Sequence, residues 1–210
     1  MMTASEALER LREGNRRFAT GELADDARPT HSRVAASAAQ ASFAIILGCS
    51  DSRVPCELIF GQGLGDLFVI RVAGNIVAPS QVGSVEFAAA SFGTKLVVVL
   101  GHSRCGAILA TLEELRQPVE NQSPNLRSIV DRVRPSVEGL LDTRLRDDPE
   151  ELVRQAVRAN VRSSVDHLRH GSEILEGLIR TGGLRVVGAE YSLESGIVDF
   201  FDERLEGVGG

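Results

Sequence analysis

Tryptophan is absent from the 210-residue sequence, tyrosine occurs once, and aromatic residues make up 4% of the chain. We therefore expect a core built mainly from alanine, valine, leucine and isoleucine, which fits a hydrophobic content of 43%. An excess of positive charge is also missing, because the net charge at pH 7 is −6. This balance gives no reason to expect nucleic acid or an anionic membrane as a partner.

Long apolar runs are missing as well. No run approaches the ~20 residues that a helix needs to span a bilayer, and residues 1–6 lack the basic head and apolar core of a signal peptide. The three cysteines argue against a disulfide framework and favour use of thiols in metal binding or catalysis. From these absences we expect a cytoplasmic protein with no membrane partner.

Short apolar runs alternate with helical patterns, which predicts an α/β fold with a mostly parallel central sheet flanked by helices. The length suits one domain over residues 1–210, with an N-terminal helical arm in 1–40 and a flexible tail in 203–210. The first helix of the arm can pack either on its own core or on a partner subunit. Expected strands lie near 43–47, 66–72, 95–100, 184–189 and 196–201, the last at an edge. Expected helices lie near 3–18, 33–40, 79–92, 106–116, 125–142, 149–170 and 172–181.

Two polar motifs come directly after two of the most apolar runs. Cys-Ser-Asp-Ser-Arg at 49–53 follows the first run, and His-Ser-Arg-Cys at 102–105 follows the run at 96–100. Runs without polar alternation are typical of parallel strands covered on both faces, and the carboxyl ends of such strands form the ligand crevice of an open α/β sheet. We therefore expect Cys49, His102 and Cys105 to converge. Cys₂His is a catalytic zinc set with a fourth position left for water.

The remaining cysteine and the other histidines are expected to be structural. Cys56 is interpreted as a small core residue. Cys105 differs from it because a predicted helix begins next to it, where the helix dipole and free N–H groups favour a thiolate. The glycine-rich stretch 61–65 lacks the spacing of a dinucleotide-binding loop, so we interpret it as a turn. The histidines interpreted as structural are His31, His167 and His170.

Asp51 and Arg53 lie two positions apart, so in an extended strand end their side chains point the same way and can form a bidentate pair. A carboxylate two residues from a zinc ligand can bind the metal in its open position, or it can accept a hydrogen bond from a metal-bound hydroxide. An arginine that holds both carboxylate oxygens favours the second alternative. A surface salt bridge of at most ~1 kcal/mol would not need to lie beside a cysteine.

The two motifs, about fifty residues apart, together resemble those of the β-class carbonic anhydrases. The resemblance extends from the N-terminal helix to Glu-Tyr-Ser-Leu-Glu-Ser-Gly at 190–196. It implies one zinc ion per chain, held by Cys49, His102 and Cys105, with an Asp51–Arg53 dyad beside it. It also implies a homo-oligomer whose basic unit is a dimer, often doubled to a tetramer.

In this family the substrate pocket lies at the subunit interface. The residues that the resemblance assigns to it are Gln40, Phe68, Phe87 and Gly106. Some members also have an inhibitory bicarbonate pocket built from Trp, Arg and Tyr. This chain has Arg71 and Tyr191 at the matching positions but Ile46 in place of the tryptophan. We therefore predict that bicarbonate does not inhibit it cooperatively.

The resemblance implies the reversible hydration of CO₂ to bicarbonate and a proton. Zinc lowers the pKa of its bound water from about 15.7 toward about 7, and Asp51, held by Arg53, accepts the hydroxide proton so that a lone pair is aimed at carbon. Two alternatives stay open. A related zinc hydrolase acting on CS₂ or COS would use the same ligands behind a narrower access route. A non-enzymatic zinc or redox-sensing module would use the thiolates without needing the dyad.

Overall fold

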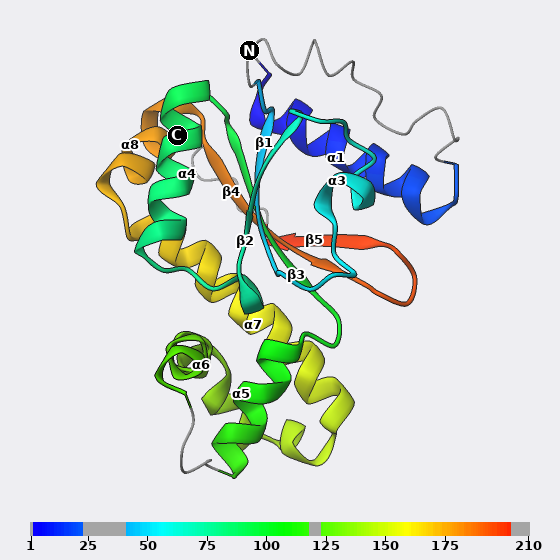
Figure 1. Ribbon diagram of the computed structural model, residues 1–210, viewed down its shortest axis with the longest axis vertical. Helices are drawn as coiled ribbons and strands as arrows, with labels where there is room; N and C mark the ends of the chain where they lie inside the picture. Colours follow the sequence, from blue (N-terminus) through cyan, green and yellow to red (C-terminus); the bar gives the residue numbers. More distant parts are fainter. Residues whose placement is uncertain (1, 23–40, 118–122, 203–210) are drawn as a thin grey trace, which may run out of the picture.

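A five-stranded sheet forms the centre of the computed structural model, which describes residues 2–22, 41–117 and 123–202 (Figure 1). The strand order is β2-β1-β3-β4-β5. The first four strands of that order run parallel, and β5 runs antiparallel to β4 at the edge, which confirms the predicted α/β sheet. The strands are β1 (Ala44–Gly48), β2 (Leu67–Arg71), β3 (Leu96–His102), β4 (Arg185–Tyr191) and β5 (Val198–Asp202).

The inner strands are the most apolar and the most buried. Every residue of β1 and β3 is buried. In register, Ile46 of β1 lies beside Val98 of β3, and Val98 lies beside Val187 of β4. Branched side chains of this kind pack well on a pleated surface that is covered on both faces. The polar motifs can therefore begin only where these strands end.

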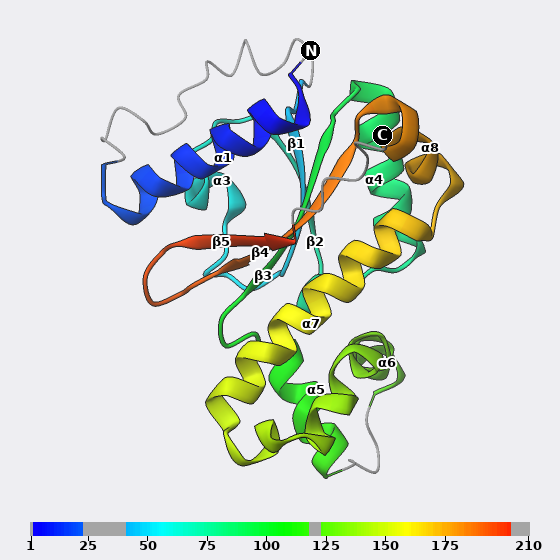
Figure 2. The same ribbon diagram turned by 180° about the vertical axis from the view of Figure 1, so that it is seen from behind.

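Helices cover both faces of the sheet (Figures 1 and 2). On one face lie α1 and the short α3, and on the other lie α4, α8 and the C-terminal part of α7. The helices are α1 (Ala4–Ala19), α3 (Cys56–Ile59), α4 (Pro79–Phe92), α5 (Gly106–Arg116), α6 (Pro124–Val137), α7 (Pro149–His170) and α8 (Glu173–Gly182).

The N-terminal helix packs on the core of its own chain. Thr3 and Glu6 form a capping box at its start: the Thr3 hydroxyl accepts from the Glu6 N–H, and the Glu6 carboxylate accepts from the Thr3 N–H. Leu8 and Leu11 recur on one face and are buried in the cluster formed with β1, β3 and β4. One face of α1 therefore packs on its own chain, while contact of the other face with a partner subunit stays a prediction. The rest of the expected arm, from residue 23 to 40, lies outside the described residues.

α5, α6 and the beginning of α7 form a layer beyond the carboxyl ends of β1 and β3 (Figures 1 and 2). Their apolar side chains form a cluster that also contains Cys49 and Cys105. Gly101 lets α7 lie against the end of β3, because a Cβ at this position would meet Val161 Cγ2 at 2.6 Å. The two polar motifs therefore lie where the sheet meets this helical layer.

Several details differ from the sequence expectations. The pattern does not indicate α3, a single turn that begins after Pro55, a residue whose fixed φ suits a helix start. The helix expected over 125–142 ends as an α-helix at Val137, because Pro135 and Gly139 weaken it there. It continues as the 3₁₀ segments η3 (Glu138–Asp142) and η4 (Arg144–Asp147). The expected helix near 33–40 and the tail 203–210 lie outside the described residues.

Within the part of the chain that the structure describes, no helix is both long enough and apolar enough to cross a membrane.

Candidate metal centre

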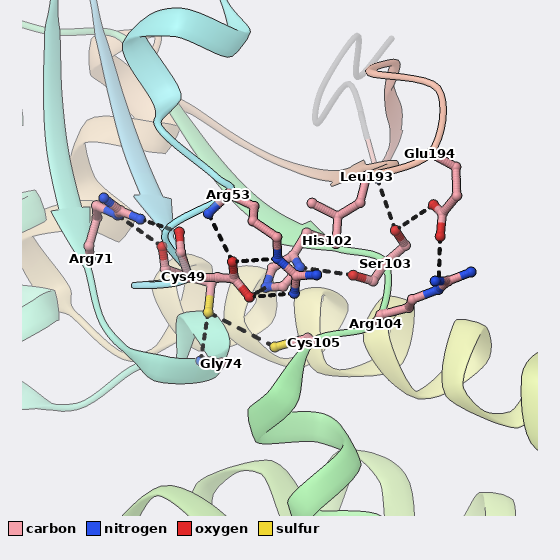
Figure 3. Close-up of polar contacts among 11 residues, drawn as sticks. Cys49, Arg53, Arg71, Gly74, His102, Ser103, Arg104, Cys105, Leu193 and Glu194 are labelled. Carbon is pink, nitrogen blue, oxygen red and sulfur yellow. Dashed lines mark hydrogen bonds and ion pairs between the residues drawn. The ribbon is translucent and has the colours of Figure 1, made fainter.

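The two motifs bring three ligand atoms together at the carboxyl ends of β1 and β3 (Figure 3). Cys49 follows the last residue of β1, His102 is the last residue of β3, and Cys105 is the N-cap of α5. Two sulfurs and an imidazole nitrogen all lie within 4.8 Å of one another, and all three side chains are buried. Among the described residues, this is the one group of three or more Cys, His, Asp or Glu side chains that could hold a metal ion.

The imidazole of His102 is oriented as a metal ligand. Its Nδ1 lies 2.9 Å from the carbonyl oxygen of Ser103, which can only accept a hydrogen bond, so Nδ1 carries the proton. Nε2 is then unprotonated and buried, and it has no hydrogen-bond partner among the described residues. Leaving a buried polar atom without a partner costs ~1–3 kcal/mol, and a bound cation would remove that cost.

The donor set and its spacing fit zinc. Two sulfurs that each lie about 2.3 Å from a tetrahedral zinc are ~3.8 Å apart, and the Sγ atoms of Cys49 and Cys105 are 4.0 Å apart. A histidine ligand whose other ring nitrogen donates to a backbone carbonyl is usual at zinc sites. Three protein ligands with an open fourth position are typical of catalytic zinc, since structural sites are closed by a fourth ligand.

The two thiols strongly affect each other's protonation. Their mutual hydrogen bond lowers the pKa of Cys49 to about 4 and raises the pKa of Cys105 well above its usual value. The N–H groups of Ala107 and Ile108 lower the pKa of Cys105, as expected at a helix N-terminus. The hydrogen bond with Cys49, burial and the repulsion of a thiolate on Cys49 raise it. A divalent cation between the sulfurs would remove that repulsion.

Asp51 and Arg53 form the bidentate pair that their spacing indicates. Arg53 Nε donates to Asp51 Oδ1 at 2.9 Å, and Arg53 Nη2 donates to Oδ2 at 2.8 Å. The backbone is a turn, however, and differs from the extended strand end that the sequence suggests. The Val54 N–H closes this turn on the Asp51 carbonyl, and the Arg53 N–H adds a third hydrogen bond to Asp51 Oδ1. The turn therefore holds the pair together more firmly than a strand end would.

The Asp51 carboxylate lies between Arg53 and the metal ligands. Its Oδ2 is 3.9 Å from Nε2 of His102, and its side chain is 17% exposed. The guanidinium of Arg53 holds the pKa of Asp51 far below its usual value, so this group is a carboxylate throughout the neutral range. Both of its oxygens are engaged by Arg53, and the carboxylate lies outside the metal-ligand group.

The loop after β1 is held by the neighbouring edge strand (Figure 3). Arg71, the last residue of β2, donates from Nε to the carbonyl of Cys49 at 2.9 Å and from Nη2 to the carbonyl of Asp51. The 3₁₀ turn η2 (Ala73–Asn75) follows β2, and its Gly74 N–H donates to Cys49 Sγ at 3.4 Å. Sequence reasoning detects neither contact, because backbone partners leave no residue pattern.

The loop after β3 is held by β4 and the turn that follows β4 (Figure 3). The Ser103 N–H donates to the carbonyl of Tyr191 at 2.9 Å. The Ser103 hydroxyl donates to Glu194 Oε2 at 2.8 Å and accepts from the Leu193 N–H at 3.0 Å. Sequence reasoning misses these roles, because 91 positions separate Ser103 from Glu194.

Arg104 gives this loop its shape. Its φ is +55°, in the left-handed region that few residues other than glycine adopt. The turn that this conformation makes lets His102 and Cys105 face the same point from positions three apart. The Arg104 side chain pairs with Glu194 Oε1 at 2.9 Å, so the same carboxylate holds both residues of the loop.

The residues that the resemblance assigns to the substrate pocket lie in different places. Gly106 directly follows Cys105 at the start of α5, and Gln40 lies outside the described residues. Phe68 and Phe87 contact each other, with ring centroids 6.3 Å apart. The register places Phe68 beside Ile45, so it lies ~13 Å along the strand direction from Cys49. Within one chain, the structure brings Gly106 but not Phe68 next to the metal ligands.

Three of the residues interpreted as structural lie outside the metal-ligand group: Cys56, His167 and His170. Burial raises the pKa of Cys56 to about 12, so this thiol stays protonated. His167 and His170 lie on α7, and His31 lies outside the described residues.

Ile46 is fully buried in the middle of β1. The absence of cooperative bicarbonate inhibition stays a prediction.

Comparisons with known proteins show the family to which this chain is similar. Residues 44–198, which contain both motifs, match the family described as carbonic anhydrase. Carbonic anhydrase 2 of Mycobacterium tuberculosis is 38% identical over 188 residues, which cover 89% of this chain and 87% of that protein. A solved structure of tetrameric β-carbonic anhydrase from Sordaria macrospora has a TM-score of 0.70 and 26% identity, covering 90% of this chain and 93% of that chain. A β-carbonic anhydrase of Aspergillus fumigatus has a TM-score of 0.73 and 26% identity, covering 91% and 89%.

Proposed function

Because this chain belongs to the β-class carbonic anhydrases and is an enzyme of that family, we propose that it hydrates CO₂ reversibly to bicarbonate and a proton at the Cys49–His102–Cys105 centre. The observation that carries the proposal is the buried Nε2 of His102, which has no hydrogen-bond partner among the described residues and lies beside two thiols. One neutral imidazole and two thiolates at this spacing suit a single Zn²⁺ ion per chain.

Zinc bound there would lower the pKa of a coordinated water toward neutral and so supply the nucleophile for CO₂. The protein's own residues determine how far the pKa of that water would fall. Cys49 and Cys105 donate more negative charge than imidazoles would, so we expect activity to rise toward alkaline pH. Ser103 fixes the ring of His102 through its carbonyl, which keeps Nε2 directed at the two sulfurs.

Asp51 orients the reacting oxygen. As a carboxylate 3.9 Å from Nε2 of His102, it can accept a hydrogen bond from a water in the open position. Accepting that bond directs the oxygen lone pair away from Asp51 and toward the carbon of CO₂. Arg53 is a positioning residue. Asp51 cannot rotate onto the metal without breaking the two hydrogen bonds that it accepts from the Arg53 side chain.

A homo-oligomer, a dimer or a tetramer built from dimers, would complete the substrate pocket. Phe68, Phe87 and Phe92 form an aromatic cluster beside the edge strand β2, with ring centroids 5.4–6.3 Å apart, and Phe87 is 55% exposed. Exposed aromatic rings beside a strand edge that pairs with no other described strand are typical of a contact surface. Rings from a partner chain, together with Gln40 and Gly106, would give apolar CO₂ a suitable lining. A fully active monomer in light scattering would contradict this part of the proposal.

Metal analysis combined with stopped-flow CO₂ hydration tests the proposed function. We expect one zinc per chain, and hydration that a chelator abolishes and added zinc restores. A panel containing CS₂ and COS separates the related hydrolases, which would turn over these substrates and leave CO₂ unchanged. Zinc binding without turnover of any of the three would indicate a non-enzymatic zinc module. Either of the last two results would reject the carbonic anhydrase assignment.

A further inference from the structure

The Cys49 sulfur receives a backbone hydrogen bond from a loop that only glycine can form. The Gly74 N–H lies 3.4 Å from Cys49 Sγ (Figure 3). Gly74 has a φ of +69°, and a Cβ at this position would meet the Cβ of Ala107 at 2.9 Å. The η2 backbone thus reaches the sulfur because no side chain separates this loop from α5.

Two side chains of α7 hold the same loop by its carbonyl groups. Asn160 Nδ2 donates to the Gly74 carbonyl at 2.8 Å, and the Ser164 hydroxyl donates to the Asn75 carbonyl at 3.1 Å. Asn160 and Ser164 lie one helical turn apart, both are buried, and neither belongs to the metal-ligand group. They fix two successive carbonyls directly after the N–H that faces the sulfur.

We propose that Asn160 and Ser164 are positioning residues for the metal centre, which hold the Gly74 N–H against the Cys49 sulfur. The inference rests on the proposed function, since it concerns a metal-bound thiolate. A hydrogen bond to such a thiolate withdraws electron density from the sulfur and leaves more positive charge on the metal. At a centre with two thiolates, this withdrawal offsets part of the charge that the sulfurs donate and so favours ionisation of the reacting water.

The chain offers a matched control for a role that is merely structural. Asn15 of α1 is also a buried asparagine, and its Nδ2 donates to the carbonyls of Ile59 at 3.2 Å and Gly196 at 2.9 Å. It holds backbone on the α1 face of the sheet and contacts no metal ligand in these hydrogen bonds. Asn15 Oδ1 also accepts from the Val198 N–H at 2.8 Å, so Asn15→Ala removes more hydrogen bonds than the one from Asn160 to Gly74. It is the more severe structural change, but only Asn160→Ala should affect the metal.

The test is the absorption spectrum of the full-length protein loaded with Co²⁺, in which a charge-transfer band reports on the thiolate–metal bond. We expect Asn160→Ala to move this band to longer wavelength, because a sulfur that loses a hydrogen bond gives up electrons more easily. Metal affinity, measured by chelator competition, should fall about 10-fold, at the lower end of the usual effect of contacts around a ligand. The cause is the released loop, because a Cys49 sulfur that is no longer held in place loses more affinity than its stronger electron donation restores. Ser164→Ala should move the band in the same direction by less. Asn15→Ala should leave both readouts unchanged.

A band at the wild-type position in Asn160→Ala, or an equal shift in Asn15→Ala, would overturn the inference and leave the proposed function intact. If Asn160→Ala does not fold, Ser164→Ala decides the question. Its control is Thr94→Val, because the Thr94 hydroxyl likewise donates to a buried carbonyl, that of Ser42, at 2.8 Å. An unmoved band in Ser164→Ala would then overturn the inference. A wild-type spectrum without any thiolate band would instead overturn the ligand assignment, and with it the proposed function.

Discussion

The two loops that carry the candidate metal ligands are held in different ways, although each follows a buried parallel strand. The loop after β1 is held through its backbone, since Arg71 donates to the carbonyls of Cys49 and Asp51. The loop after β3 is held largely through a side chain, the hydroxyl of Ser103, which bonds Glu194 and the backbone after β4. In both cases the support comes from the next strand outward in the order β2-β1-β3-β4.

This difference indicates how sensitive each loop is to mutation. Arg71 makes charge-assisted hydrogen bonds directly to the backbone that carries Cys49 and Asp51. The pair of Arg104 and Glu194 is 72% and 49% exposed, and exposed ion pairs contribute little to stability. We therefore expect damage to the first loop to be larger than damage to the second, once the ligands themselves are set aside.

Removing a ligand should have the largest effect and should be equally severe in both loops. Cys49→Ser and His102→Ala should each lose most of their zinc, because two protein ligands hold the ion far more weakly than three. Cys56→Ser is the matched control. The Cys56 thiol is buried outside the metal-ligand group, so its replacement should leave one zinc per chain. Metal analysis of the purified variants measures this. Full zinc content in Cys49→Ser would contradict the ligand assignment.

Arg53→Ala should separate metal binding from turnover within the first loop. The variant should keep its zinc, but its turnover should fall at least about 100-fold. Without Arg53, Asp51 can rotate onto the metal, and the reacting oxygen then loses its position and orientation. Activity should recover in part as pH rises, since hydroxide competes with the carboxylate for the open position. X-ray absorption of the zinc-loaded variant identifies the fourth ligand.

Asp51→Asn provides the companion to that variant. It should also be slow, for a different reason, because an amide nitrogen facing the reacting oxygen donates a hydrogen bond where the carboxylate accepts one. An Arg53→Ala protein whose fourth ligand remains water, with turnover near that of the wild type, would refute the role given to the dyad.

Arg71→Ala tests the support of the first loop. We expect zinc affinity to fall about 10-fold in chelator competition, since the backbone of Cys49 and Asp51 loses its hold on β2. Arg71→Lys should recover only part of this loss, because a single ammonium group lacks the planar fork that reaches both carbonyls. Wild-type affinity in Arg71→Ala would show that the Gly74 contact alone holds the loop.

Glu194→Gln should have the smallest effect, and its pH dependence gives it a signature. The hydrogen bond from Ser103 holds the pKa of Glu194 below its usual value, so the carboxylate stabilises the folded state above the unfolded pKa of about 4.3. That contribution is lost as pH falls through the lower folded pKa. The melting temperature should therefore drop by at most ~3 °C at pH 7. The difference should shrink as pH falls below about 4.3 and vanish below the lowered folded pKa. If the difference in melting temperature between the variant and the wild type persists at acidic pH, it does not come from the charge of Glu194.

The sequence predicts the inner strands and the convergence of Cys49, His102 and Cys105 well, because both leave local patterns. Val97, Val98 and Val99 without polar alternation indicate a strand covered on both faces, and polar residues directly after such a strand lie at its carboxyl end. The supports of the ligand loops leave no such pattern. Arg71 and Asn160 bond to backbone carbonyls, which any residue supplies, and Glu194 meets Ser103 across 91 positions.

Other features depend on geometry that residue types do not determine. The turn at 51–54 contains no glycine or proline that would predict it. Arg104 adopts a left-handed conformation at a position where the sequence has no glycine. The high pKa of Cys105 follows from its 4.0 Å distance to Cys49, which is known only once the strands are paired. The assignment of Gln40, Phe68 and Phe87 to the substrate pocket rests on resemblance alone. Phe68 lies away from the candidate metal ligands of its own chain.

The order of these elements along the chain also affects when the protein acquires its metal during synthesis. Cys49, His102 and Cys105 all leave the ribosome before β4, which ends at Tyr191. At about 5–20 residues per second, the 86 residues between Cys105 and Tyr191 (191 − 105) take roughly 4–17 seconds to make. For that time the nascent chain presents all three ligands on loops that lack the support of β4. A metal ion bound at that stage would be held without the contacts from Ser103 to Tyr191 and Glu194, so we expect it to be retained less firmly than in the complete fold.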